Sequence, residues 1–277
     1  MVRTFLARGL LIGLLAGLIA GAFAFAFGEP RVDHAIALEE AAAQAGAPDP
    51  DAGTAEHGHA EAAEHGHAEA AEHGHAEAAG HGHGEDAVVS RPVQKAGLFL
   101  ATGLYGLAVG GVFALVFAGL RGRVGPRSDG RLAVAAAGTA FTAIILVPFV
   151  KYPANPPAVG DPDTINSRTL LYVVMILVGL AATAIAVATA RRVEGGPWAR
   201  WTAAAVAFLV PVVAAWWLLP AVNEVPEGFP ATLLWEFRLA SIGTQLVFWT
   251  AFGVLFGWAS DRAERRAAAH PLVAAPS

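Results

Sequence analysis

Six long apolar segments constrain the fold of this chain more than any other feature. They cover residues 9–27, 96–120, 132–150, 170–190, 202–222 and 239–259, and they contain no Asp, Glu, Lys, Arg or His. A helix needs about 20 apolar residues to cross the hydrocarbon layer of a bilayer. Only 15% of all residues are charged, whereas soluble domains have about 25%. We therefore predict an all-α integral membrane protein with about six transmembrane helices.

Two of these segments have alternative readings. Residues 1–27 begin with the basic stretch MVRTFLARGL, as a signal peptide does, but the apolar part exceeds the usual 7–15 residues. Glycines 9, 13, 17 and 21 share one helix face, where another helix can approach closely, so we expect a retained transmembrane helix. Pro211 lies within 202–222. We expect it to kink this helix without breaking it, since neighbouring groups can satisfy the freed carbonyl.

The charged residues predict the topology. Segments 1–8, 121–131, 191–201 and 260–277 hold 12 of the 18 basic residues and four of the 23 acids. Basic residues are retained on the cytoplasmic side. Six spans with both termini in the cytoplasm satisfy this rule, whereas five spans would export the arginine-rich tail. The expected organisation is an N-terminal transmembrane helix (1–27), an exterior loop (28–95), a five-helix membrane core (96–259) and a cytoplasmic tail (260–277).

The exterior loop carries a histidine repeat between residues 56 and 85. The unit EHGHAEAA occurs three times, followed by a degenerate copy, and it contributes eight candidate metal ligands: His57, His59, His65, His67, His73, His75, His81 and His83. Neutral imidazole binds Zn, Cu, Ni and Co ions. Residues two apart do not share a helix face, so a His-Gly-His pair chelates through a turn that glycine permits. We expect a disordered metal-collecting arm; the alternative is a solvated repeat expansion without function.

A second group of candidates lies near the other exterior loops. The loops KYPANPPAVGDPDTINSRT and NEVPEGFPATLLWEFR are rich in proline, which fixes φ, so we expect rigid caps with oxygen ligands. The seven candidates for a vestibule or path are Asp161, Asp163, Glu224, Glu236, Arg238, Ser241 and Gln245. Carboxylates suit many divalent ions. The alternative for most of these side chains is ordinary solvation or a helix-to-helix hydrogen bond.

Several functions are disfavoured by what the sequence lacks. There is no cysteine and no G-x-x-x-x-G-K-[ST] motif, so thiolate sites and an internal ATPase are excluded. No basic run suggests nucleic acid, and no histidine lies in a span to ligate haem. We expect no enzyme and no tightly bound cofactor. A membrane potential of 100 mV supplies about 4.6 kcal/mol to an entering divalent cation, which corresponds to roughly a 2,000-fold concentration ratio.

The two proline-rich loops carry a family resemblance. KYPANPPAVGDPDTINSRTLLY, NEVPEGFPATLLWEFRLASIGTQ and a first span ending in GEP resemble the CbtA family of predicted cobalt transporter subunits. The resemblance implies a link to cobalamin biosynthesis and a small partner of the CbtB type with its own histidine motif. It supplies no ligand set. The family is often described with five spans, whereas the charges here favour six.

These observations lead to one functional prediction and one alternative. We expect the chain to take up a divalent transition metal, Co²⁺ first and Ni²⁺ or Zn²⁺ next, across the bacterial cytoplasmic membrane. The alternative is a membrane subunit that binds or senses metal and regulates a partner without transporting the ion. The absence of ionisable residues from the spans favours that alternative, because such residues usually mark ion routes.

Overall fold

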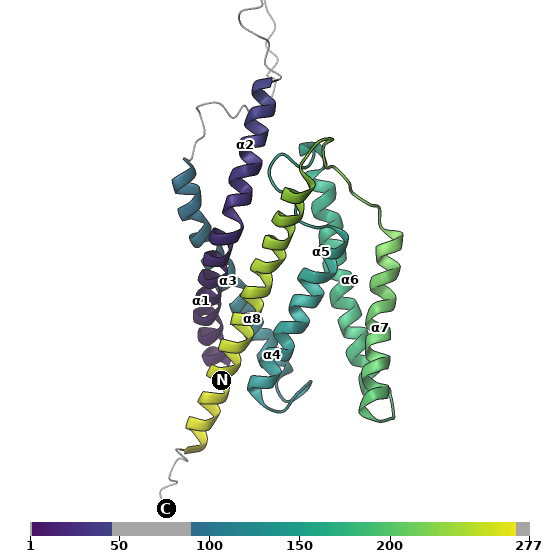
Figure 1. Ribbon diagram of the computed structural model, residues 1–277. Helices are drawn as coiled ribbons and strands as arrows, with labels where there is room; N and C mark the ends of the chain where they lie inside the picture. The colour runs from purple at the N-terminus through teal and green to yellow at the C-terminus, as the bar shows by residue number, and fades with distance from the viewer. Residues whose placement is uncertain (1, 46–89, 270–277) are drawn as a thin grey trace, which may run out of the picture.

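The computed structural model describes residues 2–45 and 90–269, and within these ranges it contains helices but no strand. The elements in chain order are α1 (Val2–Phe27), α2 (Glu29–Ala45), α3 (Arg91–Leu120), α4 (Asp129–Ala140), η1 (Phe141–Leu146), α5 (Val147–Lys151), η2 (Pro162–Thr164), α6 (Ile165–Arg192), α7 (Pro197–Leu218) and α8 (Ala231–Ala269). Figure 1 shows their arrangement.

Six helical segments of the described chain are long and apolar enough to cross a membrane. They are α1, α3, the joined elements α4–η1–α5, α6, α7 and α8. The all-α fold and the six predicted spans are thus confirmed. Helix α7 continues through Pro211 without a break. Helix α2 was not predicted, because its residues fall in the segment expected to form an exterior loop.

The connections between the helices lie at two opposite ends of the molecule (Figure 1). One end, here called the terminal end, holds the start of α1, the end of α8 and the arginine-bearing connections after α3 and α6. The other, here called the α2 end, holds α2 and the proline-rich connections 152–164 and 219–230. Charge is therefore segregated along the helix axes in the way that the positive-inside rule requires of a membrane protein.

Helices α1 and α3 approach each other through glycine on both sides. The buried residues of α1 are Gly9, Gly13, Ala16, Gly17, Ala20 and Gly21, and they face Gly103, Gly106 and Gly110 of α3. A Cβ atom on Gly106 would overlap the carbonyl oxygen of Gly13 and lie 2.9 Å from the Cα of Gly17. In a bilayer, where lipid is as apolar as leucine, such close backbone contact is a main source of helix association.

An aromatic cluster joins α3 to α8 beside this glycine contact. Phe117, Phe252 and Phe256 are fully buried, and Phe113 is nearly so. The Phe113 ring meets the Phe252 ring edge-on with centroids 4.8 Å apart, a geometry that aromatic quadrupoles favour. Together, the glycine contact and the aromatic cluster hold α1, α3 and α8 against one another.

The third span contains a π-helical stretch, η1, between α4 and α5. Pro148 follows it by two residues, and a proline cannot donate the backbone hydrogen bond of a regular helix. At the same level a Cβ on Gly179 of α6 would overlap the carbonyl oxygen of Ala143. The wider helical turn of η1 therefore contacts the backbone of α6 directly.

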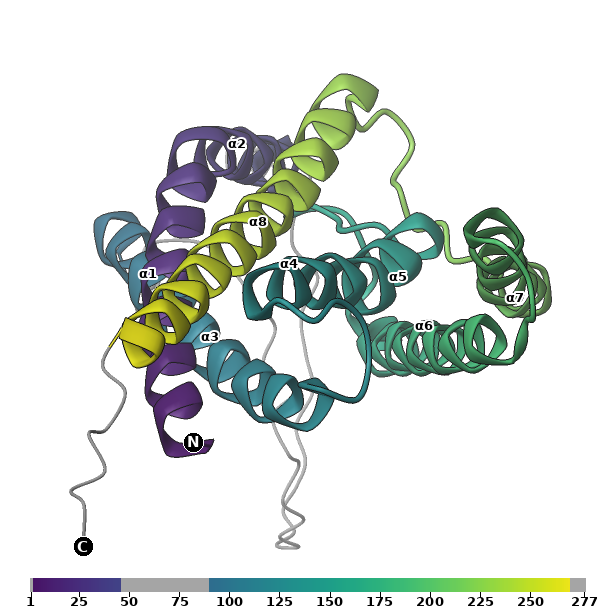
Figure 2. The ribbon, with the colours of Figure 1, turned by 90° about the horizontal axis from the view of Figure 1, so that it is seen from below.

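Helix α7 lies at the edge of the bundle, as the end-on view in Figure 2 shows. It packs against α6, and none of its residues is buried. Trp198, Trp201 and Trp217 are more than 70% exposed. Large aromatic side chains of this kind are common at the two interfaces of a membrane, so the exposed faces of α7 fit contact with lipid.

Candidate functional site

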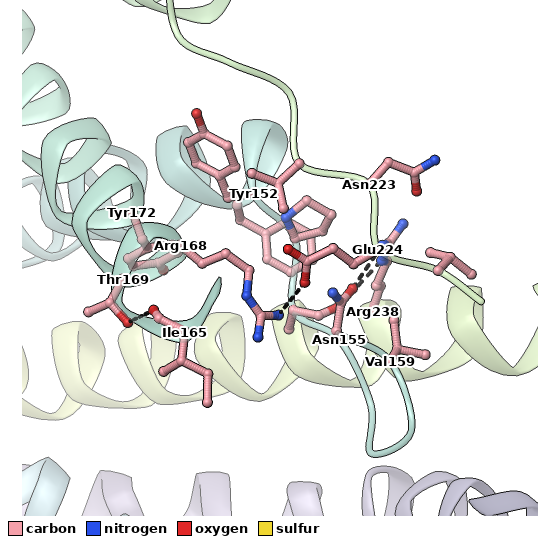
Figure 3. Close-up of a pocket in the computed structure, with 15 residues that line it drawn as sticks. Tyr152, Asn155, Val159, Ile165, Arg168, Thr169, Tyr172, Asn223, Glu224 and Arg238 are labelled. Carbon is pink, nitrogen blue, oxygen red and sulfur yellow. Dashed lines mark hydrogen bonds and ion pairs between the residues drawn. The ribbon is translucent and has the colours of Figure 1, made fainter. Parts of the chain in front are cut away.

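A pocket of about 600 Å³ opens at the α2 end of the molecule. It lies between the connection 152–164, the first turns of α6, the connection 219–230 and the start of α8. Its lining residues are Phe149, Tyr152, Pro153, Ala154, Asn155, Val159, Ile165, Arg168, Thr169, Tyr172, Val222, Asn223, Glu224, Val225 and Arg238. Figure 3 shows that side chains from both proline-rich connections and from two helices converge on it.

The connection 152–164 is held in a fixed shape. Ala158 has φ +64° and Gly160 has φ +123°, and a positive φ is strained for a residue with a side chain. The hydroxyl of Tyr152 donates a hydrogen bond of 2.8 Å to the carbonyl of Pro220 on the other connection. Removal from water raises the pKa of this tyrosine. The two connections are thus fastened to each other above the pocket.

Arg168 and Glu224 form an ion pair across the pocket. Their Nη1 and Oε2 atoms are 3.3 Å apart, and the same Oε2 accepts a 3.0 Å hydrogen bond from the backbone N–H of Asp161. That hydrogen bond, an interaction with the Thr164 side chain and the charge of Arg168 together lower the pKa of Glu224. The carboxylate is therefore already committed to partners within the protein, which weakens it as a ligand for a metal ion.

One donor of Arg168 is left over. Its Nη2 donates to the carbonyl of Asp161 at 3.2 Å, but its Nε is buried and has no hydrogen-bond partner among the described residues. A buried donor without a partner costs roughly 1–3 kcal/mol. The guanidinium also lies close to the backbone of Gly160, where an added Cβ would be 2.5 Å from its Nη1, so a side chain at position 160 would displace it.

Arg238 reaches the same pocket from α8 (Figure 3). Its Nη2 donates to Asn155 Oδ1 at 3.0 Å and its Nε to the carbonyl of Ala154 at 3.3 Å. Both acceptors are neutral, and among the described residues no carboxylate forms an ion pair with it. Glu224 is the single carboxylate among the described lining residues, so the pocket carries one more positive than negative charge.

This charge balance limits what the pocket can hold. A divalent cation about 5 Å from an unpaired guanidinium is repelled by roughly 2 kcal/mol in bulk water and by roughly 7 kcal/mol at an effective dielectric constant near 20. A bare metal ion is thus disfavoured beside Arg238. In agreement, no group of three or more His, Asp or Glu side chains that could hold a metal ion occurs in the described ranges.

The structure brings only some of the predicted path residues together. Arg238 and Glu224 line one pocket, and Asp161 bonds to Glu224 through its backbone. The side chain of Asp161 instead accepts a hydrogen bond from the backbone N–H of Asp163, which fixes the short helix η2. These carboxylates therefore serve mainly to shape the connection.

The remaining predicted residues lie elsewhere on α8. Glu236 pairs with Arg31 of α2 at 3.4 Å, and the Ser241 hydroxyl donates to the carbonyl of Phe237 one turn earlier. Gln245 accepts a 3.3 Å hydrogen bond from the hydroxyl of Tyr105 on α3. The eight repeat histidines fall in 46–89 and lie outside the described residues.

Arg168 and Asn155 were not among the predicted site residues. Both belong to the quoted loop motif, and Arg168 is one of the few basic residues outside the arginine-rich segments. That isolation was the available signal. A basic side chain at the end of the molecule that is otherwise poor in arginine is an exception to the positive-inside rule. Such an exception indicates a nearby carboxylate that pairs with it, which here is Glu224.

The fold and the pocket define a multi-pass helical membrane protein with charge-segregated ends and a polar pocket at one of them. The chain belongs to the CbtA family, whose description is "Probable cobalt transporter subunit"; the match covers residues 2–261. No curated protein and no solved structure matches the chain at a significant level. The resemblance noted in the proline-rich loops is therefore confirmed, and the family description supports a role in metal transport in which the chain acts as a subunit.

Proposed function

We propose that this protein is the multi-span subunit of a Co²⁺ uptake system that serves cobalamin synthesis, with both termini in the cytoplasm of a bacterium. The observation that carries the proposal is the segregation of charge between the two helix ends (Figure 1). By the positive-inside rule the α2 end faces outward. The histidine repeats connect α2 to α3 and would then meet the metal before it crosses the membrane.

In this proposal the histidine repeats raise the local concentration of metal, and passage occurs elsewhere. Ni²⁺ and Zn²⁺ bind similar imidazole ligands, so selectivity for cobalt would arise downstream of the arm. The protein performs no covalent chemistry. The membrane potential supplies the driving force, because two positive charges moving inward release energy.

A partner subunit completes the path. The spans hold no acidic or histidine side chain except at their ends, although such groups usually mark ion routes. The polar contact between Tyr105 and Gln245 joins α3 to α8, and it is a candidate lining for a shared route. A small membrane protein with its own histidines, of the CbtB type, fits the missing ligands.

One alternative function has a specific observation in its favour. The described residues contain no cluster of metal ligands, and the pocket at the α2 end is positively charged. A subunit that binds metal through its repeats and regulates a partner, without transporting the ion itself, would have these properties.

Uptake of ⁵⁷Co²⁺ tests the proposal. Proteoliposomes that contain this chain, with and without a CbtB-type partner, are given an inside-negative potential, and empty vesicles serve as the control. Accumulation above the control that requires both the potential and the chain is expected. Rates equal to those of empty vesicles under all conditions would leave only the regulatory alternative.

A further inference from the structure

The pocket at the α2 end has a ligand chemistry that differs from that of a cation vestibule. Its charged lining residues are two arginines and one glutamate, and the glutamate is paired with Arg168. Arg238 is bound only by neutral oxygens, those of Asn155 and Ala154. The positive charge of Arg238 is therefore available to a ligand.

Three further residues with donor groups, Arg168, Asn223 and Tyr172, line the same space. The buried Nε of Arg168 has no hydrogen-bond partner among the described residues. Guanidinium groups form strong, directional hydrogen bonds with carboxylates and phosphates. Figure 3 shows the ends of Arg168 and Arg238 on either side of Glu224.

We propose that this pocket binds a small oxyanion, meaning a carboxylate or phosphate group, through Arg238 and Arg168. A volume of about 600 Å³ is within the range of small-molecule sites. Two sources could present this chemistry: a solute such as citrate, free or as its cobalt chelate, and the phosphate of an anionic lipid headgroup. The chelate deepens the proposed function, since an anionic carrier would bring Co²⁺ past the repulsion of Arg238. Binding of the oxyanion itself does not depend on transport.

The test measures citrate binding to the full-length protein in nanodiscs of neutral phosphatidylcholine. The wild-type protein should bind citrate saturably and more weakly at high salt. Arg238→Gln should weaken binding about tenfold or more, because a hydrogen bond to a charged group is worth roughly one to two factors of ten. Arg265→Gln removes one charge from the opposite end of the same helix and should leave binding unchanged.

A second variant separates charge from structure. Asn155→Asp keeps the oxygen that accepts the hydrogen bond from Arg238, so the contact between α8 and the connection 152–164 survives. The new carboxylate, however, balances the positive charge of the guanidinium. If the pocket binds an oxyanion, this variant should lose citrate affinity as strongly as Arg238→Gln while its melting temperature holds. Citrate affinity unchanged in Asn155→Asp would overturn the proposal, because Arg238 would then serve only to clamp the loop.

The two sources are distinguished by the lipid. If a headgroup occupies the pocket, phosphatidylglycerol in the nanodiscs should weaken citrate binding to the wild-type protein, and native mass spectrometry should show retained lipid that Arg238→Gln releases. If a solute occupies it, native mass spectrometry should show no retained lipid that Arg238→Gln releases, and any effect of phosphatidylglycerol on citrate affinity should disappear at high salt, which screens the surface charge. If the wild-type protein binds neither citrate nor phosphate and retains no anionic lipid, the proposed site is refuted.

The outcome is independent of cobalt uptake. Citrate binding without ⁵⁷Co²⁺ accumulation would support the oxyanion site and contradict the proposed transport function. Accumulation of ⁵⁷Co²⁺ without oxyanion binding would support transport and contradict the oxyanion site. At fixed free Co²⁺, faster uptake on addition of citrate in the wild type but not in Asn155→Asp would identify the chelate as the form delivered.

Discussion

Gly13 of α1 and Gly106 of α3 exclude each other's side chains. A Cβ on either residue would overlap the carbonyl oxygen of the other, so the two backbones touch with no atom between them. This reciprocal contact lies within the row of glycines that joins the first two spans. It makes α1 an integral part of the bundle.

The first prediction concerns this contact. Gly106→Ala should destabilise the protein by roughly 1–3 kcal/mol, the usual cost of adding atoms to a packed site, because the helices must move apart. Gly119→Ala is the matched control on the same helix, since its added Cβ would meet nothing within 4 Å. Thermal unfolding in detergent measures both variants. Equal melting temperatures would contradict the close approach.

The second prediction concerns Asp261, which caps another helix at the terminal end. Its Oδ1 accepts a 2.7 Å hydrogen bond from the backbone N–H of Gly130 in the first turn of α4. Asp261→Ala should therefore cost about 0.5–2 kcal/mol, as the loss of a helix cap does. Arg265→Ala, an exposed change on the same helix end, should be near neutral in the same unfolding assay.

The third prediction is a pH dependence of the link between α2 and α3. Hydrogen bonds from Lys95 and then Arg91 lower the pKa of Asp33 below 3.8. The ionised form is favoured in the folded state, so the stabilisation is present above pH 3.8 and is lost as the pH falls through the lower, folded-state pKa. Asp33→Asn should lower the free energy of unfolding at about pH 6 by at most about 1 kcal/mol for so exposed a pair, and this difference should shrink progressively as the pH falls below 3.8. A difference that persists in acid would exclude the ion pair as its cause.

The fourth prediction concerns residues 56–85. If the repeats collect metal, their deletion should raise the metal concentration that gives half-maximal uptake and leave the maximal rate nearly unchanged. Replacement of the eight histidines by glutamine at constant length is the matched control and should have the same effect. Loss of the maximal rate in either variant would assign the repeats to the path itself.

The fifth prediction is the release of metal from the repeats by acid. Imidazole must be neutral to ligate a metal and titrates near 6.5, so bound Co²⁺ should leave the repeats as the pH falls through about 6. Equilibrium dialysis of the full-length protein against ⁵⁷Co²⁺ at several pH values measures this. Tight binding that survives at pH 4 would identify carboxylates as the ligands.

Much of the fold followed from periodicity and charge. The glycines of residues 1–27 predicted a face for close packing, and α3 supplies the partner face. Helix α2 was missed although Ala and Glu, which dominate Glu29–Ala45, are strong helix formers; its polarity made it resemble a loop. The π-helical turn at Phe141–Leu146 has no comparable sequence signal, because apolar residues there continue without a change of pattern.

The site was less predictable for a physical reason. Arg168 lies in the first turn of α6 and Glu224 in the connection 219–230. The two are far apart in the sequence, and only the packing of the helices brings their charges together. From the sequence, the carboxylates of the two proline-rich connections suggested a vestibule for cations. It could not reveal that Glu224 bonds to the backbone of Asp161, or that Arg238 meets only neutral oxygens.

The ion pairs of Asp33 with Arg91 and Lys95 have a consequence for how this gene can change. They fasten the first turns of α2 to the first turns of α3, and residues 46–89 lie between these two helices in the sequence. Gain or loss of whole eight-residue units between residues 46 and 89 should therefore leave this link between α2 and α3 in place. The number of eight-residue repeats should therefore vary among related strains, whereas both proline-rich loops should keep a constant length.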